Sequence, residues 1–288
     1  MLINAKTKGL GLLGHPVSHS FSPAIHNAIS ASLGLNYTYL AFDVEPRCIE
    51  DSVKGLSALG FVGCNVTVPH KTTVIPFLTE ISKEAKIIGA VNTISFDKNR
   101  LIGYNTDSYG FSKMLEDESV DLKGKKVLIM GAGGAARAVV ASCIIKESSQ
   151  IHVCSRDKNK SDDYVKVFDE NLSSNTKMYS LTYNDLNSNP KKFDVVVNCT
   201  PLGMHPHEDK TPVDVSIFDQ STVLVDLIYN PYHTEFLKQG IENGMKVVNG
   251  LGMLVHQALE AYRIWTGKTE TAEFVMNALR ENGIIHTS

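Results

Sequence analysis

The amino-acid sequence predicts an α/β fold made of two domains, each built on a largely parallel β-sheet. Three observations support this prediction. Short apolar runs with strand periodicity alternate with helical patterns along most of the 288 residues, an order that is typical of parallel sheets. A polar stretch at 116–126 separates two such series. The second series opens with an apolar strand, a glycine-rich turn and a helix, which is how dinucleotide-binding units begin.

The elements of the first series follow one another at short intervals. A strand with three glycines covers Gly9–Gly14, and Ser22-Pro23 then predicts a helix start, with serine as the N-cap and proline at the first helical position. A short buried strand at Asn65–Val68 ends at Pro69, because proline cannot donate to the ladder. The other elements are expected at Tyr37–Val44 (strand), 46–59, 72–78 and 80–88 (helices), Ala90–Phe96 and Leu101–Tyr104 (a hairpin) and 108–116 (helix).

The second series repeats strand and helix. Its first strand, Lys126–Met130, leads into a glycine turn at Gly131–Ala136 and a helix at Arg137–Ile145. Further strands are expected at Gln150–Ser155, Met178–Leu181, Asp194–Asn198, Val223–Ile228 and Lys246–Asn249, and further helices at 157–172, Met253–Trp265 and Thr271–Asn282.

Composition and charge narrow the class of protein. The formal net charge of -3 and the 20% of charged residues give no electrostatic reason to expect nucleic acid or an anionic membrane as a partner. The five cysteines are odd in number and form no CxxC pair, so we expect reduced thiols in a cytoplasmic protein. We expect neither a signal peptide nor a membrane span, because no apolar run approaches the ~20 residues that a span needs.

The glycine turn carries a cofactor signal. It reads Gly131-Ala132-Gly133-Gly134-Ala135-Ala136 and matches the G-x-G-x-x-G/A pattern between a strand and a helix. The first glycine permits a tight turn, the second removes a Cβ that would collide with a pyrophosphate, and Ala136 lets helix and strand pack closely. The helix N-terminus offers N–H groups to the phosphates. We predict that residues 131–135 bind a dinucleotide; a plain glycine turn is the alternative.

The end of the next strand bears on which dinucleotide binds. NAD sites usually place an acidic residue there, whereas this chain has Ser155 followed by Arg156, with Lys160 close behind. Both cations can reach a 2′-phosphate, and arginine can bind it with two hydrogen bonds. These residues favour NADP. Asp157 argues for NAD, because its carboxylate would repel a 2′-phosphate or could bind a 2′-hydroxyl.

Several short motifs together resemble one known family. They are Ser20-Phe21-Ser22-Pro23, Asn65-Val66-Thr67-Val68-Pro69-His70-Lys71, Gly89-Ala90-Val91-Asn92-Thr93, Tyr104-Asn105-Thr106-Asp107 and Asn249-Gly250-Leu251-Gly252-Met253 with Gln257. In this order and spacing, through nearly the whole chain, the sequence resembles the shikimate dehydrogenase family. The resemblance implies a substrate-binding domain at 1–107, completed by 251–288, and an inserted Rossmann NAD(P)-binding domain at 117–250. It also implies the reversible, NADPH-dependent reduction of 3-dehydroshikimate to shikimate, a step toward chorismate and the aromatic amino acids.

The resemblance assigns binding roles to individual residues. Ser20 and Ser22 correspond to ligands of the substrate carboxylate, which agrees with two hydroxyl donors beside a helix N-terminus forming an uncharged anion site. The other assignments are Thr67, Asn92 and Gln257 on the ring hydroxyls of the substrate, Tyr229 closing over the substrate, and Leu227 and Gly250 lining the nicotinamide.

Lys71 and Asp107 match the family's catalytic pair. The reaction needs an acid–base group at the substrate oxygen while hydride moves at carbon. Lysine is a cation at neutral pH, so it suits proton donation during ketone reduction. Asp107 then orients Lys71 and binds substrate hydroxyls. We expect the two side chains to share one crevice, although they are distant in the sequence.

Three alternatives remain. A neighbouring subfamily accepts quinate and NAD. A non-catalytic sensor on the same fold would bind the ligand without turnover, and loss of Lys71 or Asp107 would mark it; both are present. A metal-dependent hydrolase could use His205 and His207, but no further ligand stands at a suitable spacing, so we predict no metal site. We expect a monomer or a homodimer.

Overall fold

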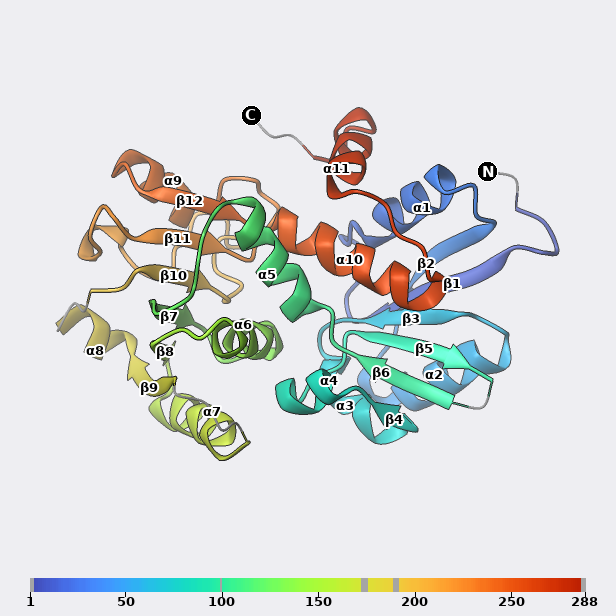
Figure 1. Ribbon diagram of the computed structural model, residues 1–288, viewed down its shortest axis with the longest axis horizontal. Helices are drawn as coiled ribbons and strands as arrows, with labels where there is room; N and C mark the ends of the chain where they lie inside the picture. Colours follow the sequence, from blue (N-terminus) through green and yellow to red (C-terminus); the bar gives the residue numbers. More distant parts are fainter. Residues whose placement is uncertain (1–2, 99, 172–175, 189–191, 286–288) are drawn as a thin grey trace. The chain divides into compact units, whose positions relative to one another are not determined.

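The computed structural model describes residues 3–98, 100–171, 176–188 and 192–285 (Figure 1). Internal contacts divide the chain into two units. Unit 1 comprises Met1–Gly110 and Val255–Ser288, and unit 2 comprises Phe111–Leu254. Each unit holds one six-stranded sheet, so the predicted α/β class with two sheets is confirmed. No described helix has the length and apolar character that crossing a membrane requires.

The sheet of unit 1 is mixed, in the order β2-β1-β3-β5-β6-β4. Its strands are β1 (Lys8–Gly14), β2 (Tyr37–Asp43), β3 (Gly63–Val66), β4 (Glu80–Ile81), β5 (Thr93–Asp97) and β6 (Arg100–Tyr104). Strand β5 runs antiparallel to both β3 and β6, and the other pairs are parallel. The carboxyl ends of β1, β3 and β6 and the amino end of β5 therefore meet at one edge of this sheet.

The helices of unit 1 are α1 (Ser22–Ser32), α2 (Ile49–Ala58), α3 (His70–Thr73), α4 (Lys83–Ile88) and α11 (Ala272–Glu281), with the carboxyl part of α10 (Leu251–Thr266). The indole of Trp265 in α10 donates to the carbonyl of Ile94 at 2.9 Å. A Cβ at Gly63 would lie 2.2 Å from that indole nitrogen, so only glycine fits there. This close packing explains why the carboxyl-terminal helices belong to unit 1.

The sheet of unit 2 is entirely parallel, in the order β12-β11-β10-β7-β8-β9. Its strands are β7 (Lys126–Met130), β8 (Gln150–Ser155), β9 (Lys177–Thr182), β10 (Val195–Asn198), β11 (Val223–Asp226) and β12 (Lys246–Asn249). The strand order reverses between β7 and β10. In doubly wound sheets such a reversal leaves a crevice beyond the carboxyl ends of the strands, where ligands bind.

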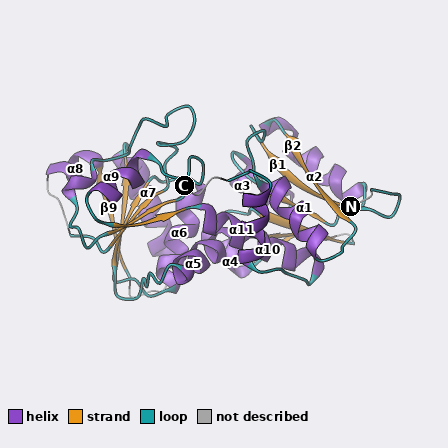
Figure 2. Ribbon diagram, turned by 90° about the horizontal axis from the view of Figure 1, so that it is seen from above, coloured by secondary structure: helices purple, strands orange, loops and turns teal. Residues whose placement is uncertain are grey.

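Helices cover both faces of this sheet, whose strands fan out in Figure 2. They are α5 (Asp107–Asp117), α6 (Gly134–Ile145), α7 (Lys158–Asn171), α8 (Tyr183–Ser188) and α9 (Glu235–Glu242). Val127 and Ile129 pack with α5, α6 and α7, whereas Leu128 and Met130 pack with α8 and α9. The period of two along β7 thus places apolar side chains in both layers, as in a buried parallel strand.

Some local predictions were wrong. Ser22 does not cap α1, because the helix starts at Ser22 itself and no side chain caps its first turn. The helix predicted at 80–88 begins only at Lys83, since Glu80 and Ile81 form β4 beside β6. The helix predicted at 72–78 is the short α3 followed by a 3-10 turn at Ile75–Phe77. Helices α8 and α9 were not predicted. The predicted turn at Asp97-Lys98-Asn99 lies partly outside the described residues.

Candidate active site

Lys71 and Asp107 lie together in unit 1. Lys71 is in α3, which follows β3, and Asp107 starts α5, which follows β6. Because both strands end at the same edge of the sheet, the two side chains meet although 36 positions separate them. The Nζ atom of Lys71 donates to Oδ2 of Asp107 at 2.6 Å, and the side chains are 16% and 4% exposed. The predicted pair therefore exists as a nearly buried ion pair whose cation retains some access to solvent.

Asn92 fixes the other oxygen of Asp107. Its Nδ2 lies 2.9 Å from Oδ1 of Asp107, 2.9 Å from Oε1 of Gln257 and 3.0 Å from Oγ1 of Thr106. Its Oδ1 accepts from the backbone N–H of Thr106 at 2.8 Å. Three of the residues assigned from the resemblance, Asn92, Asp107 and Gln257, thus form one cluster. Thr106 joins it through both backbone and side chain, a role that sequence reasoning did not assign although Thr106 stands inside a quoted motif.

A buried hydrogen-bonded chain continues from this cluster. Asn65 donates to the carbonyl of Asn92 at 3.1 Å and to Oγ1 of Thr93 at 3.0 Å. The hydroxyl of Tyr39 donates to Oδ1 of Asn65 at 2.7 Å. Burial raises the pKa of Tyr39 well above its usual range, although the Ser22 side chain lies close enough to lower that pKa, so this hydroxyl keeps its proton. Sequence reasoning missed Tyr39, because its period-2 position in a strand reads as ordinary core.

The two serines lie where the chain from β1 enters α1. The Ser20 hydroxyl donates to Oγ of Ser22 at 3.1 Å and accepts from the backbone N–H of Ser22 at 3.2 Å. Ser22 forms no cap bond with its helix, and its hydroxyl accepts from the Ser20 side chain instead. Thr67 is half-buried, and its methyl group lies 2.3 Å from where a Cβ at Gly14 would stand. Glycine at 14 therefore leaves the room that Thr67 occupies.

The glycine turn lies in unit 2 between β7 and α6, at the reversal of strand order. Gly131 has φ of +106°, and a Cβ there would lie 3.1 Å from the carbonyl oxygen of Cys199. A Cβ at Gly133 would meet nothing within 4 Å, so the space over the helix start is open. No side chain caps the first turn of α6, whose N–H groups can receive an anion. This arrangement fits a dinucleotide pyrophosphate.

The segment after β8 shows what Asp157 does. Its Oδ1 accepts from the backbone N–H of Asn159 at 3.0 Å, and its carbonyl accepts from Ser161 N–H at 3.2 Å and from the Ser155 hydroxyl. Asp157 therefore caps α7. Arg156 and Lys160 are exposed, and neither forms an ion pair with another described residue. Arg156 and Lys160 thus lie near the Asp157 carboxylate, which already accepts a hydrogen bond from the first turn of α7.

Leu227, Tyr229 and Gly250 also lie in unit 2, after the carboxyl ends of β11 and β12. A Cβ at Gly250 would lie 2.2 Å from the carbonyl oxygen of Leu227, so glycine is required for the two segments to pack. The backbone N–H of Leu227 donates to the carbonyl of Asn198 at 3.1 Å. Burial raises the pKa of the Tyr229 hydroxyl. The three residues share the edge of the sheet at which the glycine turn stands.

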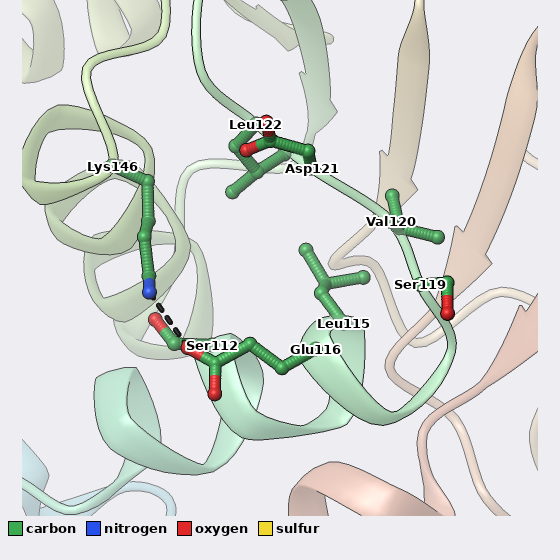
Figure 3. Close-up of a pocket in the computed structure, with 8 residues that line it drawn as sticks. All are labelled: Ser112, Leu115, Glu116, Ser119, Val120, Asp121, Leu122 and Lys146. Carbon is green, nitrogen blue, oxygen red and sulfur yellow. Dashed lines mark hydrogen bonds and ion pairs between the residues drawn. The ribbon is translucent and has the colours of Figure 1, made fainter.

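A pocket of about 350 Å³ in unit 2 holds none of the predicted site residues (Figure 3). It lies between the end of α5, residues 118–122 and the end of α6. Glu116 accepts there from Lys146 at 2.7 Å and from Lys113 at 2.6 Å, and these side chains lower the pKa of Glu116 to about 2. In the described ranges, no three His, Cys, Asp or Glu side chains are grouped as metal ligands.

Comparisons with known proteins agree with one another. Three family models match the chain: the shikimate dehydrogenase substrate binding domain at 12–94, shikimate / quinate 5-dehydrogenase at 113–231, and the shikimate 5'-dehydrogenase C-terminal domain at 250–280. A shikimate dehydrogenase (NADP(+)) of Methanococcus maripaludis strain C6 is 45% identical over 269 residues, which cover 93% of this chain and 94% of that protein.

Solved structures match nearly the full length. A crystal structure of shikimate dehydrogenase in complex with NADP+ has a TM-score of 0.89 and 43% identity, covering 98% of this chain and 97% of that one. Shikimate 5-dehydrogenase of Listeria monocytogenes, in complex with shikimate and NAD, has a TM-score of 0.86 and 31% identity, covering 96% and 98%. On the evidence of its motifs, its fold and these matches, the chain belongs to the shikimate dehydrogenase family.

Proposed function

We propose that this protein is an NADP-dependent shikimate dehydrogenase, which reduces 3-dehydroshikimate to shikimate reversibly. The observation that carries the proposal is the ion pair of Lys71 and Asp107, held in place by Asn92 at 2.9 Å. A buried lysine–carboxylate pair with a neighbouring amide can bind a hydroxyl or ketone oxygen and exchange a proton with it. The resemblance in sequence to relatives named shikimate dehydrogenase (NADP(+)) agrees with this chemistry.

We infer that unit 1 binds the substrate. Ser20 and Ser22 receive its carboxylate through hydroxyl donors, without a buried cation. Thr67, Asn92 and Gln257 contact its ring hydroxyls, and Asp107 accepts from one of them. The hydrogen bonds of Tyr39 and Asn65 support this arrangement, because they link Tyr39, which lies beside Ser22, to the Asn92 cluster through buried, satisfied groups.

Lys71 acts as the acid in ketone reduction. Its ammonium donates a proton to the ketone oxygen, which becomes a hydroxyl, and the lysine is left as a neutral amine; in the reverse direction the amine takes the proton back. Asp107 holds the ammonium at 2.6 Å, which fixes the direction of its remaining N–H bonds. NADPH, when bound, supplies the hydride.

We infer that unit 2 binds the cofactor. Residues Gly131, Ala132, Gly133, Gly134 and Ala135 receive the pyrophosphate at the start of α6. Arg156 and Lys160, with Ser155, receive the 2′-phosphate. Leu227 and Gly250 line the nicotinamide, and Tyr229 contributes a substrate contact. The open space above Gly133 supports the pyrophosphate assignment, and the capping role of Asp157 supports NADP, because a carboxylate bonded to helix N–H groups repels a phosphate less.

We also propose that the enzyme acts in the cytoplasm, as a monomer or a homodimer. All five cysteines are free, and three of them are buried, which suits a reducing compartment.

The activity can be tested with the purified protein. Shikimate and quinate are each offered with NADP+ and with NAD+, and reduced cofactor is followed by absorbance. We expect shikimate with NADP+ to give the highest kcat/KM of the four combinations. Turnover of quinate with NAD+ at an equal or higher kcat/KM would favour the quinate-using alternative. Binding of shikimate without turnover in any combination would favour the sensor.

A further inference from the structure

A second cluster of buried polar groups lies in unit 2, centred on the carboxylate of Asp226 at the end of β11. Its Oδ1 accepts from the backbone N–H of Ile228 at 3.0 Å and from Nδ2 of Asn198 at 3.1 Å. Its Oδ2 accepts from the hydroxyl of Thr234 at 2.7 Å. The same Thr234 oxygen caps α9 by accepting from the N–H of Leu237. One carboxylate therefore bonds to both ends of the segment 227–234.

This carboxylate is buried at 0% exposure, and in the described part of the chain no lysine, arginine or histidine forms an ion pair with it. A buried charge without a cation is costly, even when neutral donors surround it. Burial is the largest cause that raises the pKa of Asp226, to about 6. An apolar residue would avoid this cost, so the position of the loop that the carboxylate holds is the gain that offsets it.

Strand β12 holds the same loop from the other side. Nδ2 of Asn249 donates to the carbonyl of Ile228 at 3.1 Å, and the N–H of Gly250 lies 3.3 Å from the same oxygen. Asn249 also donates to the carbonyl of Tyr232 at 2.6 Å. The backbone N–H of Ile228 is thus fixed by Asp226 at the end of β11, and its carbonyl is fixed by Asn249 and Gly250 at the end of β12. Tyr229 follows directly, and Leu227 precedes.

A third connection runs toward the glycine turn. Oδ1 of Asn198 accepts from the N–H of Thr200 at 2.9 Å and from its hydroxyl at 2.7 Å, while Nδ2 of Asn198 bonds to Asp226. A Cβ at Gly131 would lie 3.3 Å from the Thr200 methyl group. The segment next to the glycine turn is therefore linked through Asn198 to the carboxylate that holds the loop after β11.

We propose that Asp226 is a positioning residue, which sets the place of Leu227 and Tyr229 by bonding to both ends of their loop. The proposal rests on the proposed function, in which Tyr229 contacts the substrate and Leu227 lines the nicotinamide. Asp226 touches neither substrate nor cofactor and acts through the backbone of Ile228 and the hydroxyl of Thr234.

The first test is Asp226→Asn in the full chain, assayed with shikimate and NADP+. The amide oxygen of the variant can still accept from Ile228 and Asn198. Its NH2 group, however, replaces the oxygen that accepts from the Thr234 hydroxyl. We expect kcat/KM to fall by about tenfold, with most of the change in the KM for shikimate. Asp219→Asn is the matched control, since its exposed carboxylate pairs with Lys192 at 3.2 Å in the same unit; we expect kinetics like the parent protein.

The second test is a double-mutant cycle with Tyr229→Phe. If Asp226 acts through Tyr229, the shikimate KM of the double variant will resemble that of Tyr229→Phe alone. Additive effects on KM would overturn the proposal, and so would an Asp226→Asn variant that melts at a lower temperature but keeps both kinetic constants. Thr234→Val removes the same donor without altering the carboxylate and should reproduce the rise in KM if Asp226→Asn does not fold. A parent protein without shikimate turnover would instead contradict the proposed function.

Discussion

In the described part of the chain, units 1 and 2 each bury one aspartate at a strand's carboxyl end, Asp226 as the last residue of β11 and Asp107 shortly after β6, and the neighbours of the two carboxylates differ. Asp107 faces the ammonium of Lys71 at 2.6 Å, whereas the partners of Asp226 among the described residues are neutral donors. A carboxylate beside a partly exposed cation can take part in proton exchange. One surrounded by an amide, a backbone N–H and a hydroxyl holds structure in place. In the proposed function Asp107 orients the ammonium that exchanges the proton, whereas Asp226 positions a loop, although burial and residue type are the same.

The two units also differ in the groups that they offer for binding an anion. The serine pair of unit 1 offers hydroxyl groups, and the segment after β8 in unit 2 offers Arg156 and Lys160 beside a helix start. In the proposed function the first receives a carboxylate and the second a phosphate. Phosphate carries more charge, so cations at an exposed position suit it. Buried titratable groups and these two cations therefore offer ways to test the contrast between the units.

The largest expected effect concerns His26 in unit 1. This ring is fully buried and stacks on Tyr39 with centroids 4.2 Å apart, and burial lowers its pKa from 6.5 to about 3. Below pH 6.5 the unfolded chain binds a proton that the folded chain refuses. Above pH 6.5 this histidine therefore does not reduce the free energy of unfolding. Below pH 6.5 that free energy falls by about 1.4 kcal/mol per pH unit toward pH 3.

Urea unfolding at pH 7 and pH 4 measures this loss, which we expect to be about 3 kcal/mol. His26→Phe keeps an aromatic ring for stacking and should flatten the dependence, whereas His207→Asn, at an exposed position, should not. An unchanged slope in His26→Phe would show that the ring is not the titrating group.

Asp226 in unit 2 should act with the opposite sign. Its folded pKa of about 6 lies above the ordinary 3.8, so the folded protein binds the proton more tightly. The stabilisation that Asp226 adds to the free energy of unfolding is therefore fully present below pH 3.8 and is lost as the pH rises through 6. The change is about 3 kcal/mol at most. Comparing Asp226→Asn with the parent at pH 4, 5 and 7 should show the variant gaining relative stability as the pH rises. A difference independent of pH would contradict the assignment of this pKa to Asp226.

The smallest effect is on cofactor choice. Arg156→Ala should lower kcat/KM for NADP+ by about tenfold and leave kcat/KM for NAD+ nearly unchanged, because only NADP+ carries the 2′-phosphate. Lys158→Ala is a matched control, since Lys158 bonds to Asp162 at 3.0 Å within α7. Equal losses with both cofactors would indicate a structural role for Arg156.

Much of unit 2 could be predicted from the sequence, because its strands are short apolar runs and its glycine turn is a local motif. The residues of the Lys71 cluster also stand in recognisable short motifs. Tyr39 and Asp226 could not be found this way. Tyr39 meets Asn65 across 26 positions, and Asp226 acquires its role from three separate segments. Hydrogen bonds between distant positions leave no periodic or local signal.

Contacts between distant positions also account for the errors in the predicted local structure. Ser22-Pro23 has the composition of a capped helix start, but the Ser22 hydroxyl accepts a hydrogen bond from Ser20 and lies beside Tyr39 instead. Strand β4 has two residues and exists only through pairing with β6. In both cases a tertiary contact overrides a local preference.

The most direct test of the account is the kcat of Lys71→Met for shikimate oxidation with NADP+, measured beside Lys54→Met. Lys54 pairs with Glu50 on the exposed face of α2, so its replacement controls for loss of a paired lysine. If Lys71 transfers the proton, kcat of Lys71→Met falls by at least about 100-fold while the shikimate KM changes much less. A kcat near that of the parent protein, with only a raised KM, would show that Lys71 binds substrate and that the acid lies elsewhere.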